Sequence, residues 1–266
     1  MFTTEFRRSS TLIRPRAGTI VEVRLDRGAI AAGERRDPIC EIEIELKSGE
    51  IAALFDLAFE IVRAVPVRLD NRSTAQRGYA LAARIEPAPV KASTPPLSAD
   101  MSVEDAFAAV ALHCLAHFQD NEIGLLAGRD PEYLHQARVA LRRLRSAFRV
   151  FDAAMPGLRS ARILDELKPV GRLLGEARDL DVFALETLPR AGSAQQAGVA
   201  ALRRRAQNAR RRATAAVRAA IAAPEYPAMM LRLVQAISAG QRRSETARPA
   251  AADVTLLKFA TKLLSH

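Results

Sequence analysis

Residues 135–149 read HQARVALRRLRSAFR and decide the fold of the larger part of the chain. Five basic side chains recur there at the 3,4,3,4 spacing that places them on one face of an α-helix, within a sector of roughly 80°. Apolar side chains occupy the neighbouring sector, which predicts burial against other helices. The basic residues, called the basic stripe below, are His135, Arg138, Arg142, Arg145 and Arg149; the apolar residues are Ala137, Leu141, Leu144, Phe148 and Phe151.

The basic stripe has few acids beside it, so it repels itself unless a polyanion, or acids from elsewhere in the fold, lie against it. A solvated helix face is the ordinary explanation for such a run. Two features favour an anion-binding surface instead. The stripe is almost purely arginine, whose planar fork suits phosphate oxygens. It also begins with His135, where a bound anion would favour the protonated ring. The pattern indicates binding of a heavily phosphorylated molecule.

The positive charge of the chain is concentrated in its later part. The 266 residues carry a formal net charge of +10 at pH 7. Residues 1–99 hold 15 Lys and Arg against 13 Asp and Glu, and residues 100–266 hold 25 against 17, so the later part contributes +8. The length predicts one large or two modest domains with enough chain to bury a core.

The cysteines and histidines do not predict a disulfide or metal framework. Cys40 and Cys114 have no useful ligand or disulfide spacing. With no secretory signal and no long apolar run, they predict a reduced, cytoplasmic protein without membrane contact. His113 and His117 have the i, i+4 spacing of a helical metal pair, but their apolar context VALHCLAHF favours packing.

A stretch rich in Pro, Ala and Ser, EPAPVKASTPPLSA at 86–99, predicts a linker between two parts. We expect domains at 1–86 and 101–266 joined by residues 87–100. Before the linker the pattern predicts a small antiparallel sheet with one helix. Its expected elements are a strand at 19–28 that turns at 26–28, a strand at 40–49 that ends at Ser48-Gly49, a helix at 50–64, and short strands at 65–71 and 78–84.

After the linker the chain is predicted to be helical. Ser102, with Asp105 three residues on, resembles a capping box and begins a helix through about residue 127. Asp130-Pro131 begins the helix with the basic stripe, and Pro156-Gly157 ends it. Further helices are expected at about 160–174, after GEARDLDVF (175–183), and at about 194–222, 227–240 and 253–265.

A second charged pattern lies on the strand at 40–49, whose charged residues alternate with apolar ones and so share one face. Three glutamates at period two repel one another on an unpaired face. Two interpretations remain open: a polar barrel interior where metal ions bridge to phosphate oxygens, or a solvated strand with cross-strand ion pairs. The charged residues are Glu41, Glu43, Glu45 and Lys47, and Glu22, Arg24 and Asp26 form a matching face on the preceding strand.

Several segments of the first part resemble the second half of the CYTH domain of the triphosphate tunnel metalloenzymes: VEVRLDRGAI (21–30), CEIEIELKSGE (40–50), ALFDLA (53–58), VPVRL (65–69) and RGYALA (77–82). The resemblance covers residues 1 to about 86. It implies part of an eight-stranded antiparallel tunnel that binds triphosphate with a divalent metal, Mg or Mn. By resemblance the metal-side acids are Glu41, Glu43 and Glu45, and the other tunnel-lumen residues are Glu22, Arg24, Lys47 and Arg77.

The first part also departs from the CYTH pattern. The family's opening strand, with its E-x-E-x-K pattern, would lie upstream of Met1. The Ser-Lys pair expected before RGY reads Ser73-Thr74. A half tunnel is therefore predicted, with hydrolysis of triphosphate impaired.

The later part resembles the CHAD domain, a helical domain often fused behind CYTH. The resemblance rests on two motifs, HQARVALRRLRSAFRVF (135–151) and LKPVGRLLGEARDLDVF (167–183). The resemblance spans about 102–266 and implies a bundle of two pseudo-symmetric halves that binds inorganic polyphosphate along a basic surface. A second His/Arg-rich helix would follow LLKFATKLLSH (256–266), so truncation and oligomerisation through uncovered apolar surface are expected. By resemblance the stripe lines that surface. Spacing adds Lys168 and Arg172, which are i, i+4 on one helix, and Arg203 and Arg210, which share a face with period seven. Arg178 either faces phosphate or pairs with Asp179 and Asp181, two acids that we expect to orient arginines and not to form a catalytic dyad.

We therefore expect an α+β protein: a partial antiparallel β tunnel followed by an all-α bundle, truncated at both ends. The leading hypothesis is non-enzymatic binding of inorganic polyphosphate or similar polyanionic phosphates. One alternative is a metal-dependent inorganic triphosphatase, a hydrolase that depends on Glu41, Glu43 and Glu45. Another is nucleic-acid binding through the basic face, against which stand an aromatic content of only 5% and the absence of Trp.

Overall fold

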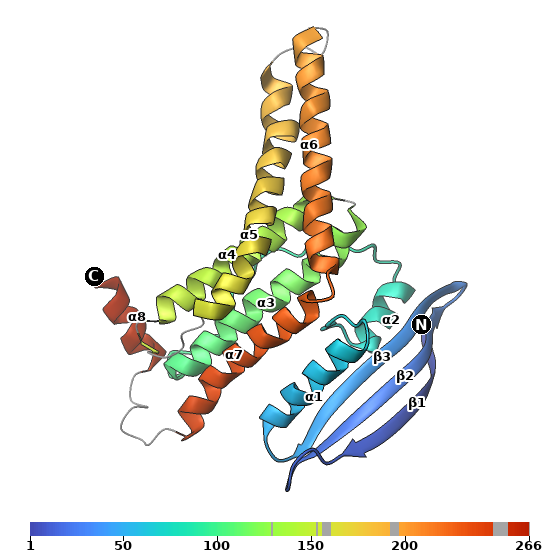
Figure 1. The fold of residues 1–266 in the computed structure, drawn as a ribbon, viewed down its shortest axis with the longest axis vertical. Helices are drawn as coiled ribbons and strands as arrows, with labels where there is room; N and C mark the ends of the chain where they lie inside the picture. Colours follow the sequence, from blue (N-terminus) through green and yellow to red (C-terminus); the bar gives the residue numbers. More distant parts are fainter. Residues whose placement is uncertain (129, 153, 156–160, 192–196, 247–254, 266) are drawn as a thin grey trace. The chain divides into compact units, whose positions relative to one another are not determined.

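The computed structural model describes residues 1–128, 130–152, 154–155, 161–191, 197–246 and 255–265. Its backbone divides into two compact units, Met1–Pro87 and Ala88–His266 (Figure 1). The first unit is a three-stranded antiparallel sheet with two helices, and the described part of the second is helical. The fold class is α+β, a partial sheet domain followed by a helical one.

The sheet of the first unit is a meander of three long strands in the order β1-β2-β3. Two helices pack against β2 and β3, and Val21, Ile30, Ile39, Ala53 and Phe55 are buried. The elements are β1 (Thr3–Ile13), β2 (Ile20–Ala32), β3 (Arg35–Ser48), α1 (Ile51–Ala64) and α2 (Thr74–Ala82).

Three predictions for the first unit were wrong. β2 does not turn at 26–28 but continues to Ala32, because Gly28 allows close strand pairing: a methyl group there would lie 2.0 Å from the carbonyl oxygen of Glu5. Residues 65–71 form no strand. Residues 78–84, predicted as a strand, lie mostly in α2, because Ser73 and Gln76 form a capping box that begins a helix.

The second unit contains six α-helices among its described residues. The cap of α3 is as predicted: the Ser102 hydroxyl accepts from the backbone N–H of Asp105 at 3.0 Å. Asp130 caps α4 by accepting from the N–H of Glu132 at 2.8 Å, with Pro131 at the first position. The helices are α3 (Val103–Ala127), α4 (Pro131–Phe151), α5 (Ala161–Val182), α6 (Ala197–Ala222), α7 (Tyr226–Thr246) and α8 (Leu256–Leu264).

Helix α5 is longer than the helix predicted at about 160–174, and two short turns stand where a further helix was predicted after residue 183. It continues through Pro169 and through the GEARDLD segment to Val182, and a π turn (Phe183–Thr187) and a 3-10 turn (Leu188–Ala191) follow it. Pro169 is exposed, so its ring does not disturb packing. The predicted stop at Pro156-Gly157 lies outside the described residues.

The core of the second unit is built on α3, α4 and α7, and α4 also packs against α5. Phe107 of α3 contacts Phe148 and Phe151 of α4, with ring centroids 5.0 and 5.6 Å apart. α5 and α6 lie side by side (Figure 1). This arrangement places one flank of α4 against α5.

Candidate functional site

The helix α4 has the two faces that its sequence predicts. Its five apolar residues are all buried, and this confirms the predicted burial. Arg142 and Arg149 of the basic stripe are exposed, while His135, Arg138 and Arg145 are half-buried. The partly buried guanidinium groups lie in an environment where electrostatic interactions are stronger than in bulk water.

The four arginines of the stripe have no ion-pair partner among the described residues. Nδ1 of His135 is buried and likewise has no hydrogen-bond partner within that part of the chain. The stripe therefore concentrates like charges and donors that no described acid neutralises.

Helix α5 lies antiparallel to the stripe and turns two glycines toward it. A methyl group at Gly171 would lie 3.8 Å from Nη1 of Arg145, and one at Gly175 would lie 4.0 Å from Nε of Arg138. Two basic residues share this face of α5 by spacing. They are Lys168, paired with Asp165 at 2.5 Å, and Arg178, whose Nη2 lies 3.2 Å from Glu186. Arg172 is exposed and has no ion pair within the described ranges.

Asp181 positions an arginine, as expected from the sequence. Its carboxylate is buried, and its Oδ1 accepts from Nε of Arg210 on α6 at 2.5 Å. Asp179 has no such partner among the described residues. Arg210 is thus turned toward α5, and the Asp181 carboxylate neutralises its charge.

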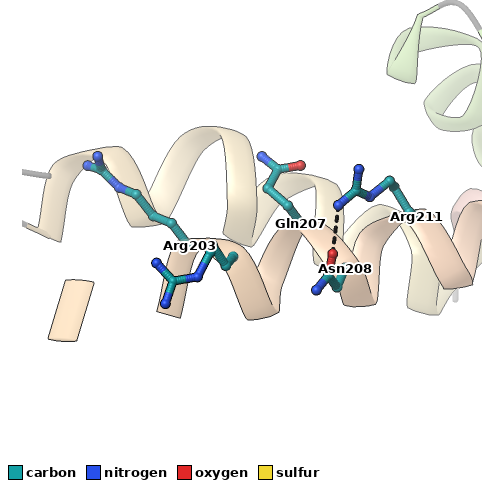
Figure 2. A pocket seen from close by; sticks show the side chains of 5 residues that line it. Arg203, Gln207, Asn208 and Arg211 are labelled. Carbon is teal, nitrogen blue, oxygen red and sulfur yellow. Dashed lines mark hydrogen bonds between the residues drawn. The ribbon is translucent and has the colours of Figure 1, made fainter. Parts of the chain in front are cut away.

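Helix α6 carries a second basic cluster (Figure 2). The cluster lines a pocket, where Nη2 of Arg211 donates a hydrogen bond to Oδ1 of Asn208 at 2.6 Å. No acid occurs along α6, and that absence is the sequence signal that could have identified the cluster. The lining residues are Arg203, Arg204, Gln207, Asn208 and Arg211, of which only Arg203 was predicted.

The charged face of the sheet is neutralised by ion pairs between its own side chains. It is made of Glu22, Arg24, Asp26, Glu41, Glu43, Glu45 and Lys47. Arg24 Nη2 lies 2.5 Å from both Glu22 and Glu45, and its Nη1 lies 3.1 Å from Glu43. Lys47 Nζ lies 2.9 Å from Glu22 and from Glu45. These are the cross-strand ion pairs of the second interpretation, since Glu22 stands opposite Glu45 and Arg24 opposite Glu43.

The remaining acids of that face also have basic partners. Arg8 Nη2 lies 2.6 Å from Asp26. Arg77 of α2 donates to Asp37 at 2.9 Å and to Glu41. These contacts place the predicted lumen residues Glu22, Arg24 and Lys47 together, and they place Arg77 at the Glu41 end of the face.

The ion pairs shift the acidic pKa values downward. The hydrogen bond from Arg24, with others from Ser10 and Lys47, lowers the pKa of Glu22 to about 2. The hydrogen bond from Lys47 lowers the pKa of Glu45, and that from Arg8 lowers the pKa of Asp26. The carboxylates are held ionised by arginine and lysine N–H groups.

The same contacts bear on the expected metal. In the part of the chain that the structure describes, no three His, Cys, Asp or Glu side chains are grouped to hold a metal ion. Glu43 and Glu45 converge on Arg24, and Glu41 turns to Arg77. This donor arrangement does not fit a divalent cation, and the metal role of the three glutamates stays a prediction.

His113 and His117 bind the segment that follows residue 87. Nε2 of His117 lies 2.9 Å from the carbonyl oxygen of Val90, and Nε2 of His113 lies 2.9 Å from Oγ of Ser93. Burial lowers the pKa of His117. The pair packs against chain, as its apolar context predicted, and part of the expected linker 87–100 is fixed to α3.

The remaining sequence expectations have brief outcomes. Cys40 is exposed, Cys114 is buried, and neither is in a disulfide. Among the helices described, none is both long and apolar enough to cross a bilayer.

Comparison with known proteins places the helical unit in a family. The CHAD domain model matches residues 109–266, and the chain belongs to the CHAD domain family. The crystal structure of the CHAD domain from the plant Ricinus communis is similar, with a TM-score of 0.59 and 34% identity. The match covers 67% of this chain and 57% of the plant chain.

A second relative concerns the sheet unit. An inorganic triphosphatase of Haemophilus influenzae (strain ATCC 51907 / DSM 11121 / KW20 / Rd) is 39% identical over 84 residues, which are 32% of this chain and 24% of that protein. The chain thus spans about a quarter of this relative. The match supports a CYTH-related N-terminal region.

Proposed function

We propose that this protein binds inorganic polyphosphate, or a similar polyanionic phosphate, along the basic stripe of α4. The observation that carries the proposal is the set of four arginines on one helix face with no ion-pair partner among the described residues. The sheet unit of the same chain pairs its charges with one another.

The chemistry of the stripe suits a chain of phosphates. Each guanidinium presents several N–H groups in a planar fork that matches phosphate oxygens. From His135 to Arg149 the donors extend over roughly 21 Å of helix axis at 1.5 Å per residue. Such a row grips successive phosphates and needs neither bases nor sugars, so affinity should depend steeply on salt.

The test is binding of long-chain polyphosphate across a salt series. The variant Arg138→Ala/Arg142→Ala/Arg145→Ala is expected to lose most of the affinity at every salt concentration. A matched control, Arg14→Ala/Arg27→Ala/Arg63→Ala, removes the same charge from exposed arginines of the sheet unit and is expected to bind like the wild type. Equal losses in both variants would show general charge attraction and refute the site.

Nucleic-acid binding is a second candidate, favoured by the pocket along α6. Its arginines and amides offer donors to a phosphodiester backbone, and α6 has no acid to oppose them. Competition of single-stranded DNA against labelled polyphosphate separates the two candidates. The variant Arg204→Ala/Arg211→Ala is expected to weaken DNA binding alone.

Triphosphate hydrolysis is a third candidate, supported by the similarity to the triphosphatase. The acids expected to act there bond to Arg24, Lys47 and Arg77 in this structure. Release of phosphate from tripolyphosphate with Mg or Mn, abolished by Glu43→Gln, would support this activity.

A further inference from the structure

Two glycines lie in the interior of α5, at positions where the backbone conformation does not require glycine. Gly171 and Gly175 are one turn apart and neither has a positive φ. Glycine inside a helix lowers its stability relative to alanine. A reason outside the helix backbone is therefore needed for both.

Close helix packing is not that reason. At Gly124 of α3 a methyl group would lie 2.2 Å from the Tyr133 ring, so packing there excludes any side chain. At Gly171 the nearest atom to an added methyl would be Leu141 Cδ2 at 3.4 Å, and at Gly175 it would be Arg138 Nε at 4.0 Å. These are ordinary contact distances, and the protein as folded has room for alanine at both positions.

The space that the glycines leave adjoins the donors of the basic stripe. Nη1 of Arg145 lies beside Gly171 and Nε of Arg138 beside Gly175. A phosphate oxygen hydrogen-bonded to such a nitrogen sits about 2.8 Å from it. A methyl group 3.8 to 4.0 Å from the same nitrogens would occupy the position of an oxygen that approaches from the α5 side, because carbon and oxygen need about 3.3 Å.

We propose that Gly171 and Gly175 keep open a narrow track along α5, through which a phosphate chain reaches the inner N–H groups of Arg138 and Arg145. This inference rests on the proposed function, because it concerns the same arginines. The ligand is held between α4 and the bare backbone of α5, not on α4 alone. Lys168 and Arg178 share this face of α5 and flank the track at its two ends.

The track also favours one class of phosphate polymer. A linear polyphosphate carries only oxygens along its chain, so it fits beside a glycine backbone. A nucleic acid carries a sugar and a base at every phosphate, and these need room that a narrow track does not provide. Gly171 and Gly175 are therefore specificity-determining residues for an unsubstituted phosphate chain.

The experiment compares Gly171→Ala/Gly175→Ala with the control Gly198→Ala. Gly198 also lies in a helix, and a methyl group there would meet nothing within 4 Å. The Tm of each variant and its Kd for long-chain polyphosphate and for single-stranded DNA are measured. The double variant should keep or raise its Tm while its Kd for polyphosphate weakens by about tenfold or more, the effect of losing a hydrogen bond to a charged group. Its Kd for DNA, and both Kd values of the control, should stay unchanged.

The outcomes separate the two proposals. Unchanged polyphosphate affinity in the double variant would overturn the track, and an equal loss for DNA would overturn its selectivity. If the double variant has a lower Tm, Gly175→Ala alone carries the same test, since its methyl has the longer contact distance. Failure of the proposed function has a different signature: no binding by the wild type, or full binding by the triple arginine variant.

Discussion

The charged face of the sheet and the basic stripe of α4 use arginine in opposite ways. On the sheet, Arg24 lies among three glutamates and each of its neighbours is neutralised. On α4, arginines follow one another along one face, and no described acid pairs with them. The difference shows that the partners of an arginine, more than its presence, distinguish a structural charge from one available to a ligand.

The physical origin of the contrast lies in the two periodicities. In an antiparallel sheet each charged residue has neighbours on adjacent strands, so acids and bases opposite one another cancel. In a helix the neighbours of a stripe residue are three and four positions away in the same sequence. A 3,4,3,4 run of one charge therefore has no local means of neutralisation.

Replacing Arg142 by Glu should have the largest effect on polyphosphate binding, because it gives the stripe an internal acid like those of the sheet. The new carboxylate would lie one turn from both Arg138 and Arg145 and pair with them. We expect polyphosphate affinity at low salt to fall by about two orders of magnitude, more than for Arg142→Ala, since one cation is lost and two are neutralised. Titration of the two variants side by side measures this, and equal losses would show that pairing does not matter.

The second prediction removes the central cation of the sheet face. In Arg24→Met, Glu22, Glu43 and Glu45 lose a shared partner and repel one another. Thermal unfolding of the sheet unit should begin several degrees lower, while polyphosphate affinity stays at the wild-type value. Arg27→Met is the control, because Arg27 is an exposed arginine of the same strand, three residues from Arg24, and has no ion pair among the described residues. A wild-type Tm for Arg24→Met would mean that the pairs contribute nothing.

The third prediction concerns pH. The folded-state pKa of Glu22 is lowered from 4.5 to about 2, so its contribution to stability is present above the unfolded value and lost as pH falls through the folded one. The sheet unit should therefore lose stability between pH 4.5 and about pH 2. Thermal melts over that range test it, and Glu22→Gln should flatten this part of the profile. An unaltered profile in Glu22→Gln would assign the acid sensitivity to other carboxylates.

How far the sequence could predict each region follows from the same periodicities. The stripe was predictable because residue spacing alone places Arg138, Arg142 and Arg145 on one helix face. For the sheet, alternation predicted that the glutamates share a face. Their partners depend on strand register, which sets Glu22 opposite Glu45 and has no local signal in the sequence.

Two of the errors in the fold fall at glycines. Gly28 suggested a turn, but it serves the close approach of β1 to β2. The helix expected at about 160–174 would end just before Gly175, yet α5 continues through Gly175 to Val182. The role of such residues depends on neighbours from other elements of the fold. Gly171 and Gly175 could not be interpreted from the sequence, because their neighbours belong to α4.

The smallest expected effect is that of salt on the protein without ligand, and it should have opposite signs in the two regions. Screening weakens the attractions of the sheet face and the repulsion within the stripe. Like charges one turn apart destabilise a helix by about 0.2–0.5 kcal/mol per pair, so added NaCl should slow amide exchange in α4 and speed it in β2. Hydrogen exchange resolved by peptide measures both regions in one sample, and Arg142→Gln should reduce the salt response of α4 alone. A slowing of exchange in both regions would indicate a general salt effect on folding, and the contrast between paired and unpaired arginines would then have no bearing on stability.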